Sequence, residues 1–366
     1  MHFSLQLKEA VYSHSMRNVC ESIDEEFVVR VNKWFFQVSP GFKVLLAALL
    51  SILVISPCHA LVVKGKTCDA IQKTIDKLPS IGGEVFIPAG LYTCTTPIIL
   101  DRDHIIIRGE GAATLLRVAD RANIPVFVMG QTIRVPTVTR RYIQVRNLMI
   151  DGNRKMQTSE CMGGECSDEF PLRNNGITIR RCEDCLVDNV TVYAAVSGGL
   201  VTELGCERLM VRDYTSYDNE YDGFAGYETE NSTFSGINLY NNKGAGISTD
   251  IHFDNNKFSD VTITNTRTVG IFMRDSSNNS FTNVHIRNTK QHGIFLAQVD
   301  DDKTKPAVGN TFNSLVITNS GGYGILISDE SCTNNLFVAS QFVNNTAGCF
   351  GEAASNLIES VGTICR

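Results

Sequence analysis

The chain has 366 residues, of which 43% are hydrophobic, and a formal net charge of −6 at pH 7. This composition is typical of a soluble globular or solenoid protein. The chain has no basic run and no basic helix, and its acidic balance argues against nucleic acid as a partner. Net charge does not exclude a negatively charged polysaccharide, because arginines gathered at one site can recognise it.

The N-terminal region contains one apolar run, residues 44–55, with Lys43 before it and Ser56-Pro-Cys-His-Ala60 after it. The run is shorter than the roughly 20 residues that span a bilayer. It predicts the hydrophobic segment of a signal peptide that is cleaved after Ala60, which makes residues 1–60 an extension and signal of a secreted or periplasmic protein without a membrane span. The region before the run is long and acidic for a signal. A translation start beyond Met1 and an uncleaved membrane anchor are therefore the alternatives.

The chain contains 12 cysteines, and ten remain once the two within residues 1–60 are removed. An even number in an exported protein predicts disulfides. Suitable local groups are Cys68 with Cys94, Cys161 with Cys166, and Cys206 one repeat beyond Cys182 and Cys185. A zinc site would need two close pairs, and the Cys-x-x-Cys at Cys182 has no such second pair or histidine nearby, which favours disulfides.

The segment from Cys68 to Leu78 has apolar residues at positions i, i+4 and i+7. This spacing predicts a short amphipathic helix that ends at Pro79 and the Gly82-Gly83 pair. Short strand-like segments separated by turns follow from Glu84 onward. A solenoid exposes apolar core at its open end, so we expect the helix to cap that end.

Between Asn174 and Thr346, seven segments begin with a glycine that is followed by alternating apolar residues. The glycines are Gly176, Gly199, Gly223, Gly246, Gly270, Gly293 and Gly324, at successive spacings of 23, 24, 23, 24, 23 and 31 residues. Each repeat has room for short strands and polar turns but not for a helix. The period predicts one turn of a single-stranded parallel β-helix per repeat, so residues 61–366 are expected to form one all-β solenoid domain. The leucine-rich repeat is excluded, because its Leu-x-x-Leu-x-Leu pattern is missing.

Two columns of side chains follow from this period. A small polar residue lies five positions before five of the glycines: Asp218, Asn241, Asn265, Asn288 and Asn319. Stacked strands lie about 4.8 Å apart, so these residues are expected to form a side-chain amide ladder. Along each glycine-led strand, the first and third residues after the glycine should point into the core. These inward residues are Ile177 and Ile179, Ile247 and Thr249, Ile271 and Met273, Ile294 and Leu296, and Ile325 and Ile327.

The fourth residue after each glycine should point outward. Successive repeats would stack these residues into one column: Arg180, Glu203, Tyr227, Asp250, Arg274, Ala297 and Ser328. Asp222 and His292 directly precede their glycines and are expected to flank the same face. The only tryptophan, Trp34, lies before the predicted cleavage site, so sugar stacking would depend on Tyr227 and on Phe272, Phe295 and Tyr323. We expect His252 and His285 to lie off this column, in structural roles.

The column has the groups that β-elimination or C5 inversion of a uronic acid requires. A cation must neutralise the carboxylate, a base must take the C5 proton, and an acid must protonate the leaving oxygen or the opposite face. Arg180 or Arg274 can neutralise the carboxylate, and Tyr227 can act as base or acid. Glu203 or Asp250 can tune Tyr227 or hold a calcium ion, although the sequence requires no cofactor.

Two other readings of the column remain open. Glu203 and Asp250 lie two repeats apart, roughly 9–10 Å by strand spacing, at the upper edge of the ~6.5–9.5 Å separation of inverting glycosidases. An exposed sheet of Arg, Glu, Tyr and Asp also forms ordinary cross-strand salt bridges. A carbohydrate-binding or surface-structural β-helix without catalysis is therefore the alternative class.

Several motifs resemble a known group of proteins. The order Gly82-Gly83, Val85-Phe-Ile-Pro-Ala-Gly-Leu-Tyr92 and Ile107-Arg-Gly-Glu-Gly111, followed by residues 142–153, resembles right-handed β-helix proteins of the pectate-lyase-like superfamily over residues 65–360. Asp222-Gly-Phe224 resembles the Asp-Gly-Phe repeats of mannuronan C5-epimerases. The catalytic Tyr-Gly-Phe-Asp-Pro-His segment of that family corresponds to Gly198–Glu203 here, which keeps none of its Tyr, Asp and His. A further catalytic Asp of that family corresponds to Tyr227. The paired Asp and Gly-His-Gly of polygalacturonases are absent as well.

The resemblance therefore implies a right-handed parallel β-helix and a polysaccharide as partner, but it does not imply the standard epimerase mechanism. We expect an exported, monomeric, polysaccharide-active protein, foremost a lyase or epimerase-like enzyme that acts on an acidic, uronate-containing glycan.

Overall fold

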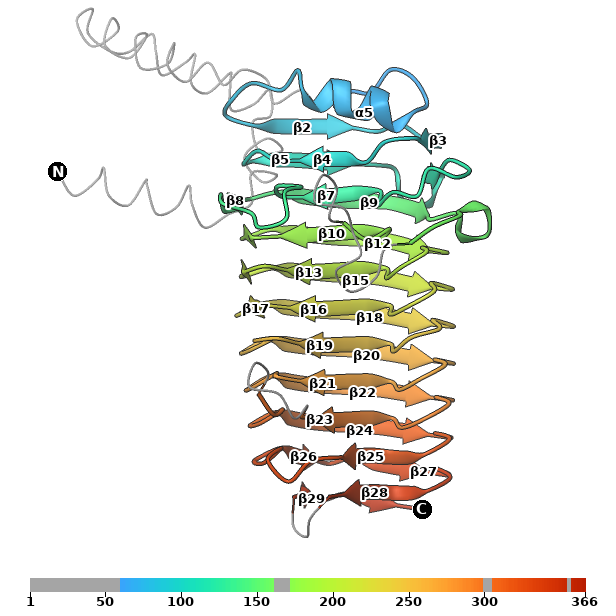
Figure 1. Cartoon of the computed structure of the whole chain (residues 1–366), viewed down its shortest axis with the longest axis vertical. Helices are drawn as coiled ribbons and strands as arrows, with labels where there is room; N and C mark the ends of the chain where they lie inside the picture. The colour runs from blue at the N-terminus through green and yellow to red at the C-terminus, as the bar shows by residue number, and fades with distance from the viewer. Residues whose placement is uncertain (1–59, 161–171, 299–304, 354–356) are drawn as a thin grey trace, which may run out of the picture. The chain divides into compact units, whose positions relative to one another are not determined.

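Parallel strands from successive turns of the chain stack into a right-handed β-helix, which runs from the N-terminal to the C-terminal end of the described residues (Figure 1). The computed structural model describes residues 60–160, 172–298, 305–353 and 357–366. Residues 60–366 form one compact unit. The predicted signal peptide and the predicted Cys161–Cys166 pair lie outside the described residues.

Three parallel sheets, here called sheets A, B and C, form the sides of the solenoid. Sheet A contains β1 (Leu61–Val62), β2 (Gly83–Phe86), β3 (Gly90–Cys94), β5 (Ile105–Arg108), β6 (Thr114–Val118), β9 (Gln144–Asp151), β12 (Leu186–Tyr193), β15 (Met210–Tyr217), β18 (Thr233–Tyr240), β20 (Lys257–Thr264), β22 (Ser280–Arg287), β24 (Thr311–Thr318), β26 (Leu336–Val338), β27 (Gln341–Val343), β29 (Glu359–Val361) and β30 (Ile364–Cys365). Sheet B contains β4 (Ile98–Leu100), β7 (Phe127–Met129), β10 (Ile177–Arg180), β13 (Leu200–Glu203), β16 (Phe224–Tyr227), β19 (Ile247–Asp250), β21 (Ile271–Arg274), β23 (Ile294–Ala297), β25 (Tyr323–Ile327) and β28 (Gly348–Glu352). Sheet C contains β8 (Arg140–Arg141), β11 (Cys182–Glu183), β14 (Cys206–Glu207) and β17 (Thr229–Glu230). Two 3-10 turns, η1 (Gly111–Ala113) and η2 (Arg154–Met156), complete the elements.

The predicted capping helix is α5 (Cys68–Ile75), which lies at the N-terminal end of the solenoid (Figure 1). Thr67 caps it, because the Thr67 side chain accepts a hydrogen bond from the Ala70 backbone N–H. Its buried face lies against the first strands, and the predicted Cys68–Cys94 disulfide ties it to β3. The helix ends at Ile75 rather than at Leu78. The next residues bond in i→i−3 turns, in which the Leu78 N–H donates to the Ile75 carbonyl.

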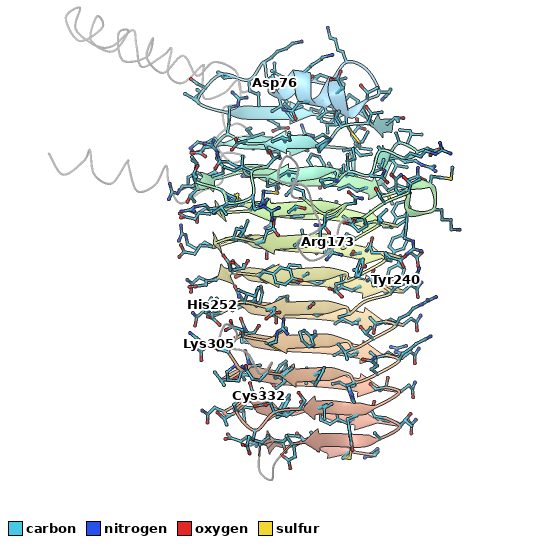
Figure 2. The ribbon with its side chains drawn as sticks, viewed as in Figure 1. Asp76, Arg173, Tyr240, His252, Lys305 and Cys332 are labelled. Atoms are coloured by element: carbon cyan, nitrogen blue, oxygen red, sulfur yellow. A yellow bond between two sulfur atoms is a disulfide. The ribbon has the colours of Figure 1, made fainter. Side chains whose placement is uncertain are left out.

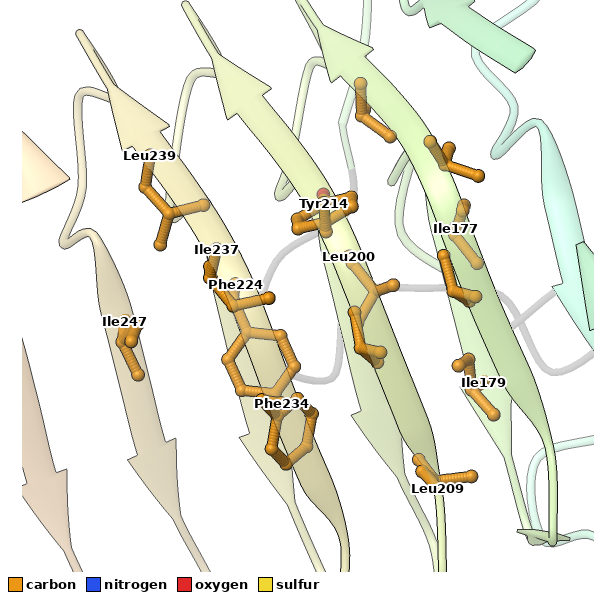
Figure 3. Close-up of a cluster of buried hydrophobic side chains, with 14 of the residues drawn as sticks. Ile177, Ile179, Leu200, Leu209, Tyr214, Phe224, Phe234, Ile237, Leu239 and Ile247 are labelled. Carbon is orange, nitrogen blue, oxygen red and sulfur yellow. The ribbon is translucent and has the colours of Figure 1, made fainter. Parts of the chain in front are cut away.

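The core confirms the predicted alternation. All ten predicted inward residues of sheet B are buried, with exposed fractions of 0–1%. Figure 3 shows the same packing around Ile177, Leu200 and Phe224, where side chains from sheets A and B meet. Sheet A adds a column of stacked rings with centroids 4.4–4.9 Å apart: Phe234, Phe258, Phe281, Phe312 and Phe337. Burial of these rings supplies much of the hydrophobic stabilisation of the C-terminal turns.

Asparagine ladders join successive turns at two of the corners. The predicted exposed ladder is confirmed for Asn241, Asn265, Asn288 and Asn319, whose side-chain amides bond in sequence at 3.1–3.2 Å. A second ladder, which the sequence analysis did not anticipate, is fully buried and joins Asn256, Asn279, Asn310 and Asn335. Each amide nitrogen of the buried ladder also donates to a backbone carbonyl, so these buried amides are hydrogen-bonded.

Two further disulfides close short loops within the solenoid. Cys182 pairs with Cys185, and Cys349 pairs with Cys365 near the C-terminus. Cys206, which the sequence placed one repeat beyond the first pair, remains a buried thiol, as does Cys332. Among the described residues, no helix is both long enough and apolar enough to cross a bilayer.

Candidate functional site

The predicted outward column runs in register along sheet B. Arg180 pairs with Glu203 across β10 and β13, and Tyr227 pairs with Asp250 across β16 and β19. Arg274 of β21 pairs with Ala297 of β23. Because the strands are parallel and in register, side chains that share a repeat position lie one above another. Each glycine-led strand thus contributes one side chain to a continuous face.

Arg180 begins the column, but its guanidinium is already occupied. Its Nη atoms donate to the backbone carbonyls of Gln131, Ile133 and Arg134, and its Nε lies 2.7 Å from the Glu203 carboxylate. The side chain is only 2% exposed. Arg180 therefore holds the segment of residues 131–134 against the start of the column, and little of it is left to meet a substrate.

Tyr227 lies near the middle of the column, half-buried among charged groups. Burial is the main cause that raises the pKa of Tyr227 to about 12, and the nearby Asp222 carboxylate adds to the shift. Asp250 and Glu203 act in the same direction more weakly, while Arg173 opposes them. The phenol of Tyr227 therefore keeps its proton at neutral pH and can donate it.

Asp222 lies directly before Gly223, just N-terminal to β16, the strand that ends with Tyr227. Its Oδ1 accepts a hydrogen bond from the Ala245 N–H at 2.6 Å. Gly244 allows this approach, since a Cβ there would lie 2.3 Å from that oxygen. Burial raises the pKa of Asp222 to about 6, although the hydrogen bond and Arg173 oppose the shift. A carboxyl group with this pKa is deprotonated at neutral pH yet basic enough to accept a proton.

Arg173 completes this group, and the sequence analysis did not find it. Its guanidinium lies 4.6 Å above the ring of Tyr221, and its Nε is 3.8 Å from the Glu160 carboxylate. Its Nε and Nη2 are buried without a hydrogen-bond partner among the described residues. The only available signal was its place three residues before Gly176, at the turn that leads into β10.

Arg173 also acts on all three acidic groups of the site, Asp222, Tyr227 and Glu203. It lowers the pKa of Asp222, Tyr227 and Glu203, against the larger effect of burial in each case. Burial also raises the pKa of Glu203, and the pairing with Arg180 only partly offsets it. The first half of the face therefore gathers a base, a proton donor and a partly available cation.

Asp250 and Arg274 form an ion pair between β19 and β21. Both carboxylate oxygens of Asp250 accept hydrogen bonds from Arg274, and Oδ1 also accepts one from the Ile251 N–H. The Asp250 side chain is 8% exposed and the Arg274 side chain 27%. Along sheet B, this ion pair lies between the acid–base group, formed by Asp222, Tyr227 and Arg173, and a group of aromatic residues.

The four aromatic residues predicted to bind substrate come together on the C-terminal side of this pair. Phe272 and Phe295 are register partners whose rings meet edge to face at 5.7 Å. His292 stacks on Tyr323 at 5.9 Å and also touches Phe295. The His292 Nδ1 accepts the Tyr323 backbone N–H, and burial lowers the pKa of His292. The imidazole is therefore neutral with its Nε2–H available as a donor.

His252 and His285, which were predicted to lie off the column, lie away from this face. His252 follows β19 at a corner, with its Nδ1 3.6 Å from the buried Asp275 carboxylate (Figure 2). His285 lies on β22 of sheet A. Within the described parts of the chain, no group of three or more His, Cys, Asp or Glu side chains is arranged to hold a metal ion.

Solved structures share this architecture at low sequence identity. The A-module of the mannuronan C-5 epimerase AlgE6 of Azotobacter vinelandii matches with a TM-score of 0.54 and 14% identity, over 81% of this chain and 94% of that one. ORF18 of Geobacillus virus E2 matches with a TM-score of 0.60 and 17% identity, over 87% of this chain and 62% of that one. The enzymatically active domain of tailspike protein 2 of bacteriophage CBA120 matches with a TM-score of 0.54 and 14% identity, over 80% and 44%. At these identities the likeness concerns the fold.

No curated protein sequence matches the chain. The family described as the right handed beta helix region matches residues 143–304 and 269–361. Since the two matches together span residues 143–361, more than half of the chain, the protein belongs to the right-handed β-helix region family.

Proposed function

We propose that this protein is an exported enzyme that acts on an acidic, uronate-containing polysaccharide by removing the proton at C5 of a uronate. The observation that carries the proposal is the group formed by Asp222, Tyr227 and Arg173. Two neighbouring groups with pKa values of about 6 and about 12 fit the roles of base and acid. A guanidinium that is not fully hydrogen-bonded fits the role of neutralising a carboxylate.

The proposed reaction divides the work among these three residues. Arg173 holds the substrate carboxylate and makes the C5 proton more acidic. The Asp222 carboxylate takes that proton, and the electron pair of the C5–H bond forms the C4–C5 double bond. The C4–O bond breaks, and the Tyr227 phenol gives its proton to the leaving oxygen. In the epimerase variant, Tyr227 gives its proton to the opposite face of C5 instead, and no bond to oxygen breaks.

Other features support the substrate class and the export. Phe272, Phe295 and Tyr323 offer aromatic surface of the kind on which sugar rings stack, in line with the acid–base group along the solenoid axis. The disulfides support an oxidising compartment, and thus the predicted export after Ala60. One structural neighbour is by name a mannuronan epimerase, which supports an acidic glycan as the substrate.

An inverting glycoside hydrolase is the second candidate, because burial raises the pKa of Glu203 and would suit a general acid. Its weakness is the partner carboxylate. Asp250 is ion-paired through both oxygens with Arg274 and is therefore a poor base for activating water.

The test is incubation of the exported protein with a panel of acidic and neutral polysaccharides in deuterated water, with and without calcium. Ultraviolet absorbance would report unsaturated uronate, a reducing-end assay would report chain cleavage, and NMR would report deuterium at C5. Absorbance with reducing ends means a lyase, and deuterium at C5 without cleavage means an epimerase. Reducing ends alone would favour the hydrolase and bring Glu203 forward.

Variants connect the activity to the site. Asp222→Asn and Tyr227→Phe should each lower kcat/KM by about 10²–10⁴-fold, the usual loss of a general acid or base. Asp218→Asn is the matched control, because an asparagine there extends the exposed amide ladder and leaves the site intact. Wild-type turnover in Asp222→Asn would contradict the proposed base. Absence of both cleavage and C5 exchange on every polymer would favour a binding protein without catalysis.

A further inference from the structure

Sheet A carries a column of three tyrosines on its outer face, away from the site on sheet B. Tyr193, Tyr217 and Tyr240 are register partners on β12, β15 and β18. Their rings stack with centroids 5.1 and 4.6 Å apart and planes within 6° of parallel. Inside such a stack, both faces of the middle ring are covered, so only an end ring can offer a face to a ligand.

The two ends of the tyrosine column differ. At one end, Asp151 is the register partner of Tyr193 and is ion-paired with Arg117. At the other end, the register partner of Tyr240 is Thr264, a side chain too short to cover a ring. The face of the Tyr240 ring that is not stacked on Tyr217 is therefore open on the side of the next turn, above Thr264.

A depression of ≈ 210 Å³ lies over β20, β22 and β24. Tyr240 borders it rather than lining it, because Tyr240 is the register partner of the lining residue Thr264. That volume equals about seven water molecules at ~30 Å³ each, the scale of one sugar residue. Its lining includes the hydroxyl groups of Thr262, Thr264 and Thr318, together with His285 and Arg287. No acidic side chain lines it, in a protein whose net charge is −6.

Arg287 is the cation of this depression. It is the register partner of Thr264 on the next turn, so it lies two strand spacings from Tyr240, roughly 9–10 Å. The side chain is exposed, and no carboxylate in the described parts of the chain forms an ion pair with it. Two van der Waals separations of about 4 Å take up most of that gap. A sugar ring that lies over Thr264 would therefore be within contact distance of both the Tyr240 ring and the Arg287 guanidinium.

We propose that this depression is a second saccharide site, which binds one residue of an anionic sugar. The sugar ring stacks on the open face of Tyr240, and its carboxylate or sulfate pairs with Arg287. The threonine hydroxyls and His285 hydrogen-bond the ring hydroxyls. The site belongs to sheet A and needs none of the residues of the sheet B site, so it would hold a polymer on a second surface of the same molecule.

Binding is measured by calorimetric titration of the exported protein carrying Asp222→Asn, which prevents turnover of the ligand. The ligands are a short oligouronate, a sulfated oligosaccharide and a neutral oligosaccharide of equal length. Arg287→Gln should weaken binding of the anionic ligands at this site about tenfold or more, as expected for loss of a charge-assisted contact. The neutral ligand should bind weakly and equally to both proteins, and the stronger anionic ligand identifies carboxylate or sulfate as the group recognised.

Two further variants separate binding from folding and from charge. Thr264→Tyr adds a fourth ring to the column, so it keeps the stack while filling the gap, and it should abolish this binding. Lys257→Gln removes one positive charge from the other end of β20, far from Thr264, and should leave saccharide binding unchanged. The proposal is overturned if Arg287→Gln and Thr264→Tyr bind like the parent protein, or if the parent binds no anionic saccharide.

The outcomes also separate this inference from the enzyme proposal. If Arg287→Gln loses binding and the protein turns over no polysaccharide, the result supports the second site and contradicts the enzyme proposal. With Asp222 intact, Arg287→Gln should keep wild-type turnover on short oligosaccharides. If the protein turns over polysaccharide but Arg287→Gln and Thr264→Tyr bind like the parent, the result contradicts the second site and supports the enzyme proposal.

Discussion

At the scale of residues, the site combines two groups whose protons are held more tightly than usual. Burial raises the pKa of Asp222 to about 6 and that of Tyr227 to about 12. Between these values, Asp222 is charged while Tyr227 is neutral, which is the protonation state that a base and an acid need. Arg173 stabilises the charged form of both groups, so it limits the two shifts.

The dependence of turnover on pH follows from these values. The logarithm of kcat/KM should rise with pH up to about 6, as free Asp222 loses its proton, and then stay flat to the alkaline limit of the assay. The flat region follows because Tyr227 loses its proton only near pH 12. A profile with its acid limb near pH 4, or with an alkaline limb near pH 8, would assign the chemistry to other groups.

Asp222 should also lower the stability of the protein. Its folded pKa of about 6 exceeds the ordinary 3.8, so the folded state binds the proton more tightly and stability falls as pH rises from about 4 to 6. The full shift corresponds to at most about 3 kcal/mol. Asp222→Asn should therefore raise the free energy of unfolding at pH 7 by about 1–2 kcal/mol and have little effect at pH 4. Urea unfolding at both pH values checks this, with Asp218→Asn as the control; a loss of stability at pH 7 would contradict the buried charge.

At the scale of elements, the corners of the solenoid depend on asparagines in two different environments. The buried ladder is hydrogen-bonded on both sides: Asn279 accepts the Asn256 N–H and donates to the Phe253 carbonyl and to Asn310. The exposed ladder instead occupies left-handed backbone positions, such as Asn265 at φ 58°. Water can replace the side-chain bonds of the exposed ladder but not those of the buried one.

Removal of one rung should show this difference. Asn279→Ala leaves a buried N–H and a buried carbonyl without partners and should lower the free energy of unfolding by about 2–4 kcal/mol. Asn265→Gly keeps the left-handed backbone without strain and should cost less than about 1 kcal/mol. Chemical denaturation of both variants measures the contrast. Equal losses would mean that burial of the amide is not what stabilises the ladder.

At the scale of the whole molecule, each turn contacts mainly its neighbours, so stability is distributed along the axis. The Cys68–Cys94 disulfide fixes the capping helix to the first turns, and Cys349–Cys365 fixes the other end. A crosslink that closes a loop of this length contributes about 3 kcal/mol in the chain-entropy description.

Replacing both Cys68 and Cys94 by serine should therefore loosen one end of the solenoid. Hydrogen exchange should become faster in β2 to β6, while β20 to β24 keep their protection, because those turns do not touch the cap. The matching double replacement of Cys349 and Cys365 should show the reverse pattern. Uniformly faster exchange in either variant would mean that the solenoid unfolds as one unit.

Much of this architecture could be predicted because it repeats. The glycine spacing fixed the register, so the inward residues were placed correctly and the column from Arg180 to Arg274 runs in register. Arg180 and Asp250 of that column are buried, whereas the prediction had them on an exposed face. The occupation of Arg180 could not be predicted, because its partners are backbone carbonyls of a loop 46–49 residues away. Arg173 was missed for a similar reason: it lies in a turn, outside the strand pattern that organised the prediction. The pairing of cysteines depends on local geometry, which explains why Cys206 was not resolved from Cys182 and Cys185.

The aromatic group formed by Phe272, Phe295, His292 and Tyr323 lies on only one side of Tyr227 along the axis. On the other side, Arg180 holds residues 131–134 at the start of the column. A glycan bound along sheet B would therefore be held by the aromatic group on one side of Tyr227 and have fewer contacts on the side of Arg180. For the proposed enzyme, uneven binding would favour repeated events along one glycan, because the bound portion stays while the unbound portion leaves. Product lengths should then be narrowly distributed rather than random.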